Sequence, residues 1–480
     1  MHIFYRILLA LGFGAVLAGC AALAHEATGK QASAPAVYPD DAMPAAGLAV
    51  ASLGWQDYYA EPRLRTLIEQ ALFYNTDIRT ALLRVDEARA AYGITRAQQY
   101  PAIDLTAAAA SNRLPSDLSP TGQALVSRDY QVALQMNAWE LDLWGRVRSL
   151  KASALASWLA TDAAQRAVSL ALIAQVADGY LRLREFDERL SLARLAIASR
   201  ESSLRIFQRR HEAGSIAELD VIQVKTLLMQ AQALVAQLEQ ARALQAHALA
   251  KLTGASPAQL TARKPYDDTL VLVAIGAGLP SMLLETRPDI VAAEHQLVAA
   301  RADVEVARAA FYPRIGLTAG LGTASAALDG LFRTGSGAWT FAPSMALPLF
   351  DGGRNRAGLV LADVRRDLAL VNYDQTIQNA FREVSDALAS RHWLGMQVDI
   401  VRATVVAQRR RARLATLRYD NGATAYFEVL DAQRDLLSVE QQLVQTRRAS
   451  LSSQVALYAA LGGGSFAIAP TNPYVPTETP

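Results

Sequence analysis

The sequence lacks several features that mark common classes of protein. Its 480 residues include one cysteine, so no disulfide can form within the chain. An excess of one charge is also missing, because 47 Lys and Arg stand against 45 Asp and Glu and leave a net charge of +2. The basic residues are dispersed and form no basic stripe. We therefore expect no nucleic-acid partner.

Motifs for enzyme chemistry are missing as well. No glycine-rich loop ends in Lys-Ser or Lys-Thr, and no Gly-x-Ser-x-Gly elbow is present. His211 and Glu212 lack the second histidine that a zinc-binding helix needs. We therefore expect no enzyme, no cofactor and no metal site.

The chain carries an internal duplication. Residues 77–107 align with 289–319 without a gap, with identity at 14 of 31 positions. The register then shifts by four residues and persists, so that Gly214 falls on Gly422. Two copies are too few for a solenoid, so the duplication predicts pseudo-symmetry within one body.

The N-terminus is typical of a bacterial lipoprotein. Residues 1–19 have the pattern of a signal peptide, with a short apolar run at 7–18 and small residues before Cys20. Cleavage there would leave Cys20 to carry acyl chains, which anchor a protein in a membrane. Ala21 follows, and in the lipoproteins this resembles, the absence of Asp goes with outer-membrane sorting. The alternative is an uncleaved membrane helix that extends to Ala24. Its three glycines and its length, at the lower limit for crossing a membrane, argue against this alternative.

Two pairs of segments have the period of β-strands. Ile103, Leu105 and Ala107 alternate with Asp104 and Thr106. The same alternation recurs, which predicts strands at about 102–113 and 128–141 in the first copy, and about 313–323 and 338–349 in the second. Their length of about ten residues suits an outer-membrane strand. An ordinary half-buried hairpin is the alternative, and the lipid anchor favours the membrane.

The remaining segments are helical, because Ala, Leu, Arg, Gln and Glu dominate them and Pro and Gly cluster at breaks. We expect one helix from Pro62 to about Gln99. A helix from about Gly145 to Ala213 would be roughly 100 Å long, so it needs parallel neighbours. Heptad-spaced residues such as Val224 and Leu238 form an apolar seam along which neighbouring helices can pack. Ordinary coiled coils have the same pattern, so the seam alone does not indicate a channel. The expected organisation is a signal peptide (1–19), an acylated arm (20–61), a first repeat (62–254), a linker (255–285), a second repeat (286–462) and a tail (463–480).

Four strands cannot close a membrane barrel, and open sheet edges in lipid leave backbone groups unpaired. Two, three or four chains would therefore have to share one barrel of at least eight strands. The predicted fold is mainly α, with long helical hairpins and a membrane β-barrel segment to which each chain contributes four strands.

Three segments carry a family resemblance. They are Trp139 to Arg146, Leu279 to Ile290, and Gly214 to Val221. Taken in their order along the chain, they resemble the motifs of TolC-like outer-membrane factors, and specifically the lipoprotein branch called NodT. The resemblance implies a homotrimer with a shared twelve-stranded barrel and a trimeric helical tunnel across the periplasm. Met282 and Thr286 depart from the family pattern, which affects only contacts in that linker.

The two helix-to-helix turns hold the candidate site residues. Gly214 and Gly422 suit the left-handed cap that ends a helix, and Ser215 and Thr424 can begin the next one. A good helical hairpin alone would explain them. The resemblance implies that these four residues form the tips where a periplasmic adaptor docks. Relatives often carry an acid where this chain has Thr424, which argues against an acid ring at that level.

We hypothesise that the tips also form the periplasmic gate. In this hypothesis Tyr419 and Asp420, with Arg418 and Arg210, tie the tips shut. Asp220 and Glu428 are further gate candidates, since symmetry would place each acid near copies of itself and require Arg partners or cations.

The leading functional prediction is the outer-membrane duct of a tripartite efflux system, carrying drugs, organic compounds or metal ions. Its expected partners are outer-membrane lipid, a periplasmic adaptor and a proton-driven inner-membrane efflux transporter. An exit duct for type I polypeptide secretion and a non-conducting lipoprotein that bridges membranes remain alternatives. The sequence does not identify the substrate.

Overall fold

The computed structural model describes residues 50, 53–120, 122–256, 260, 275 and 282–464. The chain separates into two units, residues 1–33 and 34–480, and everything described belongs to the second unit. Cys20, the expected signal peptide, and most of the expected arm, linker and tail lie outside the described residues. Within the described part, no helix combines the length and hydrophobicity needed to cross a membrane.

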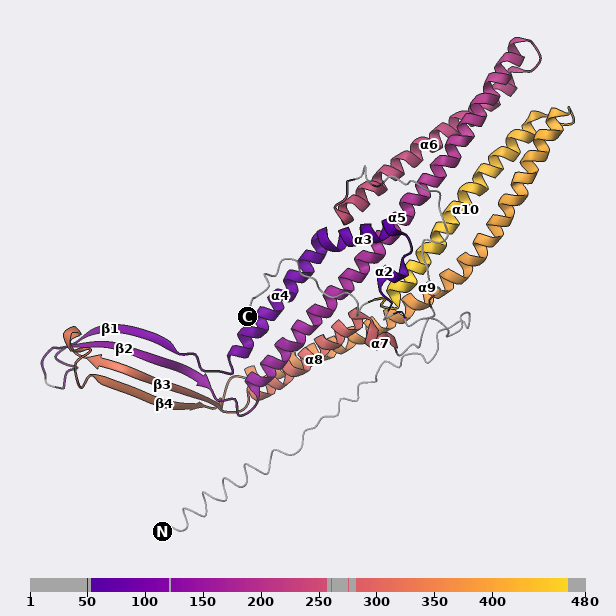
Figure 1. Ribbon diagram of the computed structural model, residues 1–480. Helices are drawn as coiled ribbons and strands as arrows, with labels where there is room; N and C mark the ends of the chain where they lie inside the picture. The colour runs from indigo at the N-terminus through magenta and orange to yellow at the C-terminus, as the bar shows by residue number, and fades with distance from the viewer. Residues whose placement is uncertain are drawn as a thin grey trace. The chain divides into compact units, whose positions relative to one another are not determined.

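The described elements of the second copy follow the order of the first, except that the first has one more helix before its strands and the second has a 3-10 helix between its strands (Figure 1). The first copy consists of α2 (Trp55–Tyr58), α3 (Pro62–Tyr74), α4 (Thr76–Ala97), β1 (Asp104–Leu114), β2 (Leu125–Glu140), α5 (Arg146–Glu212) and α6 (Glu218–Thr253). The second consists of α7 (Met282–Thr286), α8 (Pro288–Ala309), β3 (Arg314–Ser325), the 3-10 helix η4 (Leu328–Gly330), β4 (Gly337–Ala346), α9 (Arg354–Asp420) and α10 (Tyr426–Ala460). Helices α5 and α9 each have 67 residues. The predicted fold class, with duplicated long hairpins and four strands, is confirmed.

The expected single helix from Pro62 to about Gln99 is wrong, because the chain breaks at Asn75. Asn75 has extended backbone angles, and its side-chain oxygen accepts hydrogen bonds from the N–H groups of Asp77 and Ile78. Those bonds satisfy the free donors of a new helix start. Its Nδ2 donates to the carbonyl of Leu252 at 3.2 Å, at the end of α6. The break therefore joins the end of the first copy to the beginning of α4.

The second copy makes the equivalent junction with a different residue. Arg287 takes the place of Asn75, and its Nη1 donates to the carbonyl of Ala460 at 2.9 Å, at the end of α10. Gly462 follows in the left-handed region, with φ of +74°. A Cβ there would lie 2.9 Å from the carbonyl oxygen of Thr286, so this close approach requires glycine. The pseudo-symmetry thus extends to individual hydrogen bonds.

The four strands form one antiparallel sheet in the order β1-β2-β3-β4 (Figure 1). Paired residues of antiparallel strands point to the same face. One row that crosses all four strands is apolar and 52–75% exposed, and it consists of Leu105, Leu134, Leu321 and Trp339. The adjacent row points to the other face and consists of Asp104, Gln135, Gly320 and Thr340. The sheet therefore has one apolar and one small or polar face, and Pro343 lies in the edge strand β4, where proline is tolerated.

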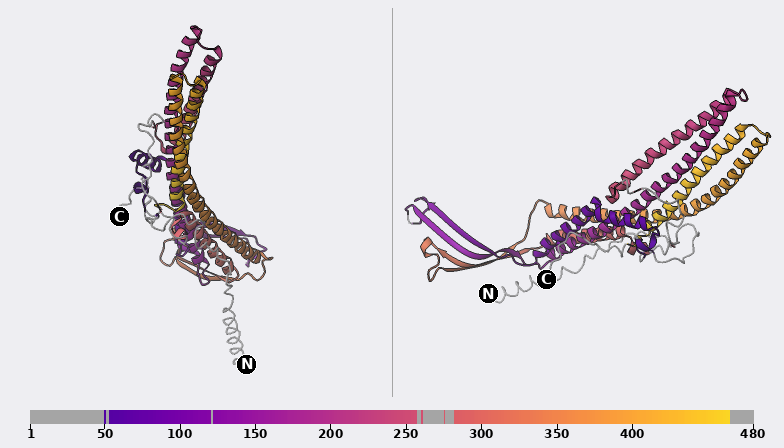
Figure 2. Two further views of the ribbon diagram at one scale, coloured as in Figure 1. Left: turned by 90° about the vertical axis from the view of Figure 1, so that its right-hand side faces the viewer. Right: turned by 45° about the horizontal axis from the view of Figure 1, so that its top comes forward.

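The long helices pack side by side in two successive sets (Figures 1 and 2). In the set that follows the sheet, α4 packs against α5, α5 against α8, and α8 against α9. In the set toward the hairpin turns, α6 packs against α5, α5 against α10, and α10 against α9. The main core lies where these sets meet, around Tyr58, Tyr59 and Tyr458. Val224 and Leu238, predicted as a seam, are both buried.

Candidate functional site: the two hairpin tips

Both hairpin turns end their first helix with the same glycine cap. Gly214 and Gly422 have φ of +74° and +72°, a region that side chains disfavour. In the first turn the N–H of Ser215 donates to the carbonyl of Arg210, and the N–H of Gly214 donates to the carbonyl of His211, both at 2.8 Å. The second turn repeats both bonds. This is the Schellman arrangement, so the predicted glycine caps are confirmed.

The expectation that Ser215 and Thr424 begin the next helices is wrong. The N-cap residues are Ala217 and Ala425, and neither makes a side-chain hydrogen bond to its helix. Ser215 is already used by the preceding cap, and α6 begins three residues later. Acidic residues in the first turns stabilise the free N–H groups electrostatically instead, namely Glu218 and Asp220 in α6 and Glu428 in α10.

Two predicted gate residues meet between the hairpins. The Arg210 guanidinium, at the end of α5, donates a hydrogen bond to the Tyr419 hydroxyl, at the end of α9. It also lies over the Tyr419 ring, 5.8 Å from the ring centre, in a cation–π arrangement. The two copies are therefore tied together at their tips within one chain.

Tyr426 completes this contact, and its role was not predicted from the sequence. Its ring lies 4.8 Å from that of Tyr419 and 4.4 Å from that of Phe207. Its hydroxyl donates to the Ser203 Oγ at 2.7 Å, and burial raises its pKa. An aromatic residue as the first residue of a helix after a turn was the available signal. Its partners lie more than 200 positions away, so no local pattern identifies them.

The other charged residues at the tips divide into paired and unpaired groups. Arg418 and Glu428 form a loose ion pair at 3.4 Å. Further along the second hairpin, Arg411 contacts Asp431 and Asp435, each at 2.7 Å, and the hydrogen bond from Arg411 lowers the pKa of Asp435.

Asp420 and Asp220 differ from these residues. Neither side chain has a hydrogen-bond or ion-pair partner in the described part of the chain, although both were predicted gate residues. The backbone places Asp420 beside Arg418 and Tyr419 in sequence, yet its carboxylate bonds to neither. Within those same bounds, no three His, Cys, Asp or Glu residues lie close enough together to hold a metal ion.

Comparisons with known proteins agree with this architecture. The model of the family described as "Outer membrane efflux protein" matches residues 67–255 and 279–463, one match to each copy. The chain is 44% identical over 413 residues to the solvent efflux pump outer membrane protein SrpC of Pseudomonas putida, covering 85% of this chain and 87% of the relative. It is 41% identical over 424 residues to the outer membrane protein OprJ of Pseudomonas aeruginosa, covering 87% and 88%. The open state of the MtrE outer membrane channel of Neisseria gonorrhoeae is similar with a TM-score of 0.82 and 36% identity, covering 90% of this chain and 96% of that one.

Proposed function

The chain belongs to the outer membrane efflux protein family, and on that premise we propose that it is the outer-membrane channel of a tripartite efflux pump. It is a passive, gated duct that carries small molecules from a periplasmic adaptor and an inner-membrane transporter to the outside. The observation that carries this proposal is that the elements of one chain form an open layer at three successive levels, with one free edge from each copy at every level.

The three levels are the sheet and the two helix sets. The sheet has β1 and β4 as its edges. The first helix set has α4 and α9 at its edges, and the second has α6 and α9. At every level one edge belongs to the first copy and the other to the second. The duplication predicts which contacts a neighbouring chain should make. Helix α9 is the equivalent of α5, and α4 is the equivalent of α8. Helix α5 packs against α8 within the chain, whereas α9 and α4 make at most marginal contact among the described residues.

Exposed apolar side chains mark these edges. Val360, Val364, Leu368 and Val371 form one stripe along α9 and are 50–65% exposed. Helix α4 exposes Leu83 and Ile94. Such faces need a partner, and a neighbouring chain provides it if α9 of one chain packs on α4 of the next. The same rotation pairs β4 with β1, which removes the sheet edges.

We infer that the ring closes as a homotrimer. Three chains give a twelve-stranded barrel, and closure pairs the backbone groups along the sheet edges inside the membrane, except that Pro343 of β4 has no N–H to donate. The apolar row containing Leu105 and Trp339 would then face lipid, and the row containing Asp104 would face the lumen. The acyl chains expected on Cys20 would add a lipid anchor.

The hairpin tips are proposed as the gate and the docking site. The Arg210–Tyr419 link and the Arg418–Glu428 pair hold the two hairpins of one chain together. Asp420 and Asp220 would face the neighbouring chain, where a cation or an arginine offsets their charge. Gly214, Ser215, Gly422 and Thr424 shape the turns that an adaptor would contact.

The substrates proposed for this duct are small organic molecules. SrpC is described as a component of a solvent efflux pump, and other relatives of Pseudomonas putida as components of toluene and antibiotic efflux pumps. These descriptions support efflux of small molecules over polypeptide secretion for this chain.

The first experiment is to extract the protein from outer membranes, measure the mass of the complex and record single channels in planar bilayers. We expect the mass of three chains and rare, brief openings, because the tips are tied in this structure. A monomer, or a trimer that stays silent after the Arg210–Tyr419 link is removed, would overturn the proposal and favour a non-conducting bridging lipoprotein.

A further inference from the structure

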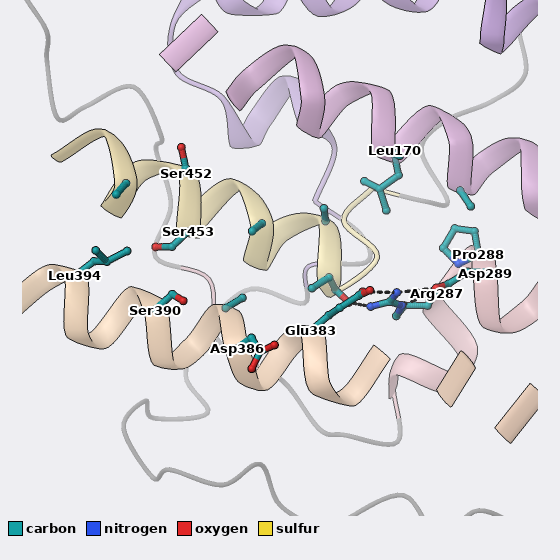
Figure 3. A pocket seen from close by; sticks show the side chains of 17 residues that line it. Leu170, Arg287, Pro288, Asp289, Glu383, Asp386, Ser390, Leu394, Ser452 and Ser453 are labelled. Carbon is teal, nitrogen blue, oxygen red and sulfur yellow. Dashed lines mark hydrogen bonds and ion pairs between the residues drawn. The ribbon is translucent and has the colours of Figure 1, made fainter. Parts of the chain in front are cut away.

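A cavity of about 760 Å³ lies between the two copies, away from the tips (Figure 3). Helices α5, α8, α9 and α10 line it, and most of its wall is apolar, with Leu170, Ala387 and Leu394 among the lining residues. Pockets that hold drug-sized ligands have volumes of about 300–1,000 Å³. The cavity is therefore large enough for a small organic molecule.

The cavity lies where the second copy carries shorter side chains than the first. At six lining positions the second copy carries a smaller side chain than the first copy does at the equivalent position. These are Ser390 for Arg182, Leu394 for Phe186, Ser452 for Leu244, Ser453 for Gln245, Ala459 for Lys251, and Ala460 for Leu252. These shorter side chains leave more space between the helices here than the first copy's side chains would.

One pair of equivalent positions shows how the first copy fills the space. Gln245 reaches from α6 to α5, where its Nε2 donates to the carbonyl of Gly179 at 3.0 Å. Ser453 is too short to span the equivalent gap to Ala387, and its hydroxyl donates to the Ser450 carbonyl at 2.7 Å instead. Ser452 likewise turns its hydroxyl to Asp178 at 2.6 Å. Both serines thus have their own partners and leave the cavity open.

The charged residues at the cavity are predominantly acidic. Asp289, Glu383 and Asp386 contribute three carboxylates, and Arg287 is the cation among the lining residues (Figure 3). Arg287 already contacts Asp289 at 2.6 Å and Glu383 at 2.8 Å, so its charge is neutralised. The Asp386 carboxylate is exposed and has no partner in the described part of the chain. The cavity therefore combines an apolar wall with unneutralised negative charge.

We propose that this cavity binds a small amphipathic organic cation, with its apolar part against Leu170 and Leu394 and its charged group beside Asp386. The proposal deepens the proposed function, since the ligand would be a molecule in transit, but it is a binding site in its own right. Binding can be measured on purified protein whether or not the channel conducts, so failure of one proposal is distinguishable from failure of the other.

The test measures binding of rhodamine 6G, a fluorescent amphipathic cation, to the full-length purified protein by fluorescence anisotropy. Fluorescein, an anionic dye of related shape, is the ligand control. The variant S452L/S453Q fills the cavity with the side chains that the first copy carries, so we expect it to fold normally and to lose saturable binding. Asp386→Asn should weaken binding about two- to fivefold, the effect of one partly solvated charge. Asp399→Asn removes an exposed carboxylate from the same helix outside the cavity and should leave binding unchanged.

Every variant is measured in the same detergent, so binding of the dye to the micelle is the same in each measurement. Saturable binding of the cation that S452L/S453Q abolishes and Asp386→Asn weakens supports the proposal. Equal binding by the wild type and S452L/S453Q would place the dye elsewhere, in the micelle or in another site, and would overturn it. Fluorescein binding as tightly as rhodamine 6G would overturn the assignment of a cationic ligand.

Discussion

At the scale of single residues, Tyr58 and Tyr59 differ in one respect that matters for stability. Both rings are buried against Tyr458 in the main core. The Tyr58 hydroxyl donates to the carbonyl of Gln454 at 2.9 Å, whereas the Tyr59 hydroxyl is buried without a hydrogen-bond partner in the described part of the chain. A buried hydroxyl without a partner costs stability, and a bonded one contributes to it.

We predict that Tyr59→Phe stabilises the protein by about 1 kcal/mol and that Tyr58→Phe destabilises it by about 1 kcal/mol. Unfolding in detergent at pH 8 measures both, and equal destabilisation by the two variants would contradict the prediction.

Burial also raises the pKa of Tyr59 well above its ordinary value. Ionisation of Tyr59 therefore leaves the stability of the fold unchanged below about pH 10 and lowers it as the pH rises above that value, where the unfolded chain loses the proton first. Tyr59→Phe should consequently weaken the loss of stability between pH 10 and 11.

At the scale of elements, most boundaries follow from local patterns, because period, proline and glycine act over a few residues. The strands and the long hairpins are predicted in this way. The break at Asn75 has no proline or glycine, and only the Asn-Thr-Asp sequence indicated a helix start there. The links between hairpins were harder to predict, since the Tyr426 and Ser203 side chains meet across 223 positions.

The Arg210–Tyr419 link gives a prediction about the paired hairpins. Tyr419→Phe removes the hydrogen bond and keeps the ring, and Arg210→Ala removes the bond and the cation–π contact. A bond of about 1 kcal/mol corresponds to a change of roughly fivefold per subunit in the balance between open and closed tips. Arg210→Ala should therefore raise the open probability of single channels more than Tyr419→Phe does.

Arg209→Ala is the matched control for these recordings, because it removes the same charge one residue away. Asp420→Lys tests the expectation that Asp420 faces a neighbouring chain, and it should change conductance. If Arg210→Ala, Tyr419→Phe and Asp420→Lys all conduct as the wild type does, the gate lies elsewhere in the duct.

At the scale of the whole molecule, the free edges predict where an assembly can be disrupted. Leu368 lies in the exposed stripe of α9 and is 65% exposed in one chain. Leu368→Asp would bury a charge against α4 of the neighbour, so we expect monomers on size-exclusion chromatography with unchanged helical content. Val298→Asp is the control, because α8 already has α5 and α9 as neighbours within the chain. Monomers from both variants, or from neither, would contradict closure through α9 and α4.

The equal lengths of α5 and α9 restrict which insertions the chain can accept during evolution. Each has 67 residues, whereas β2 has 16 and β4 has 10, so the copies have diverged in the sheet and not in these helices. One residue inserted into α5 alone would advance its tip by about 1.5 Å and turn it by about 100°, which would separate Arg210 from Tyr419. An adaptation to a wider periplasm would therefore require matched insertions of whole heptads in both copies, while a loop outside the cell could lengthen freely.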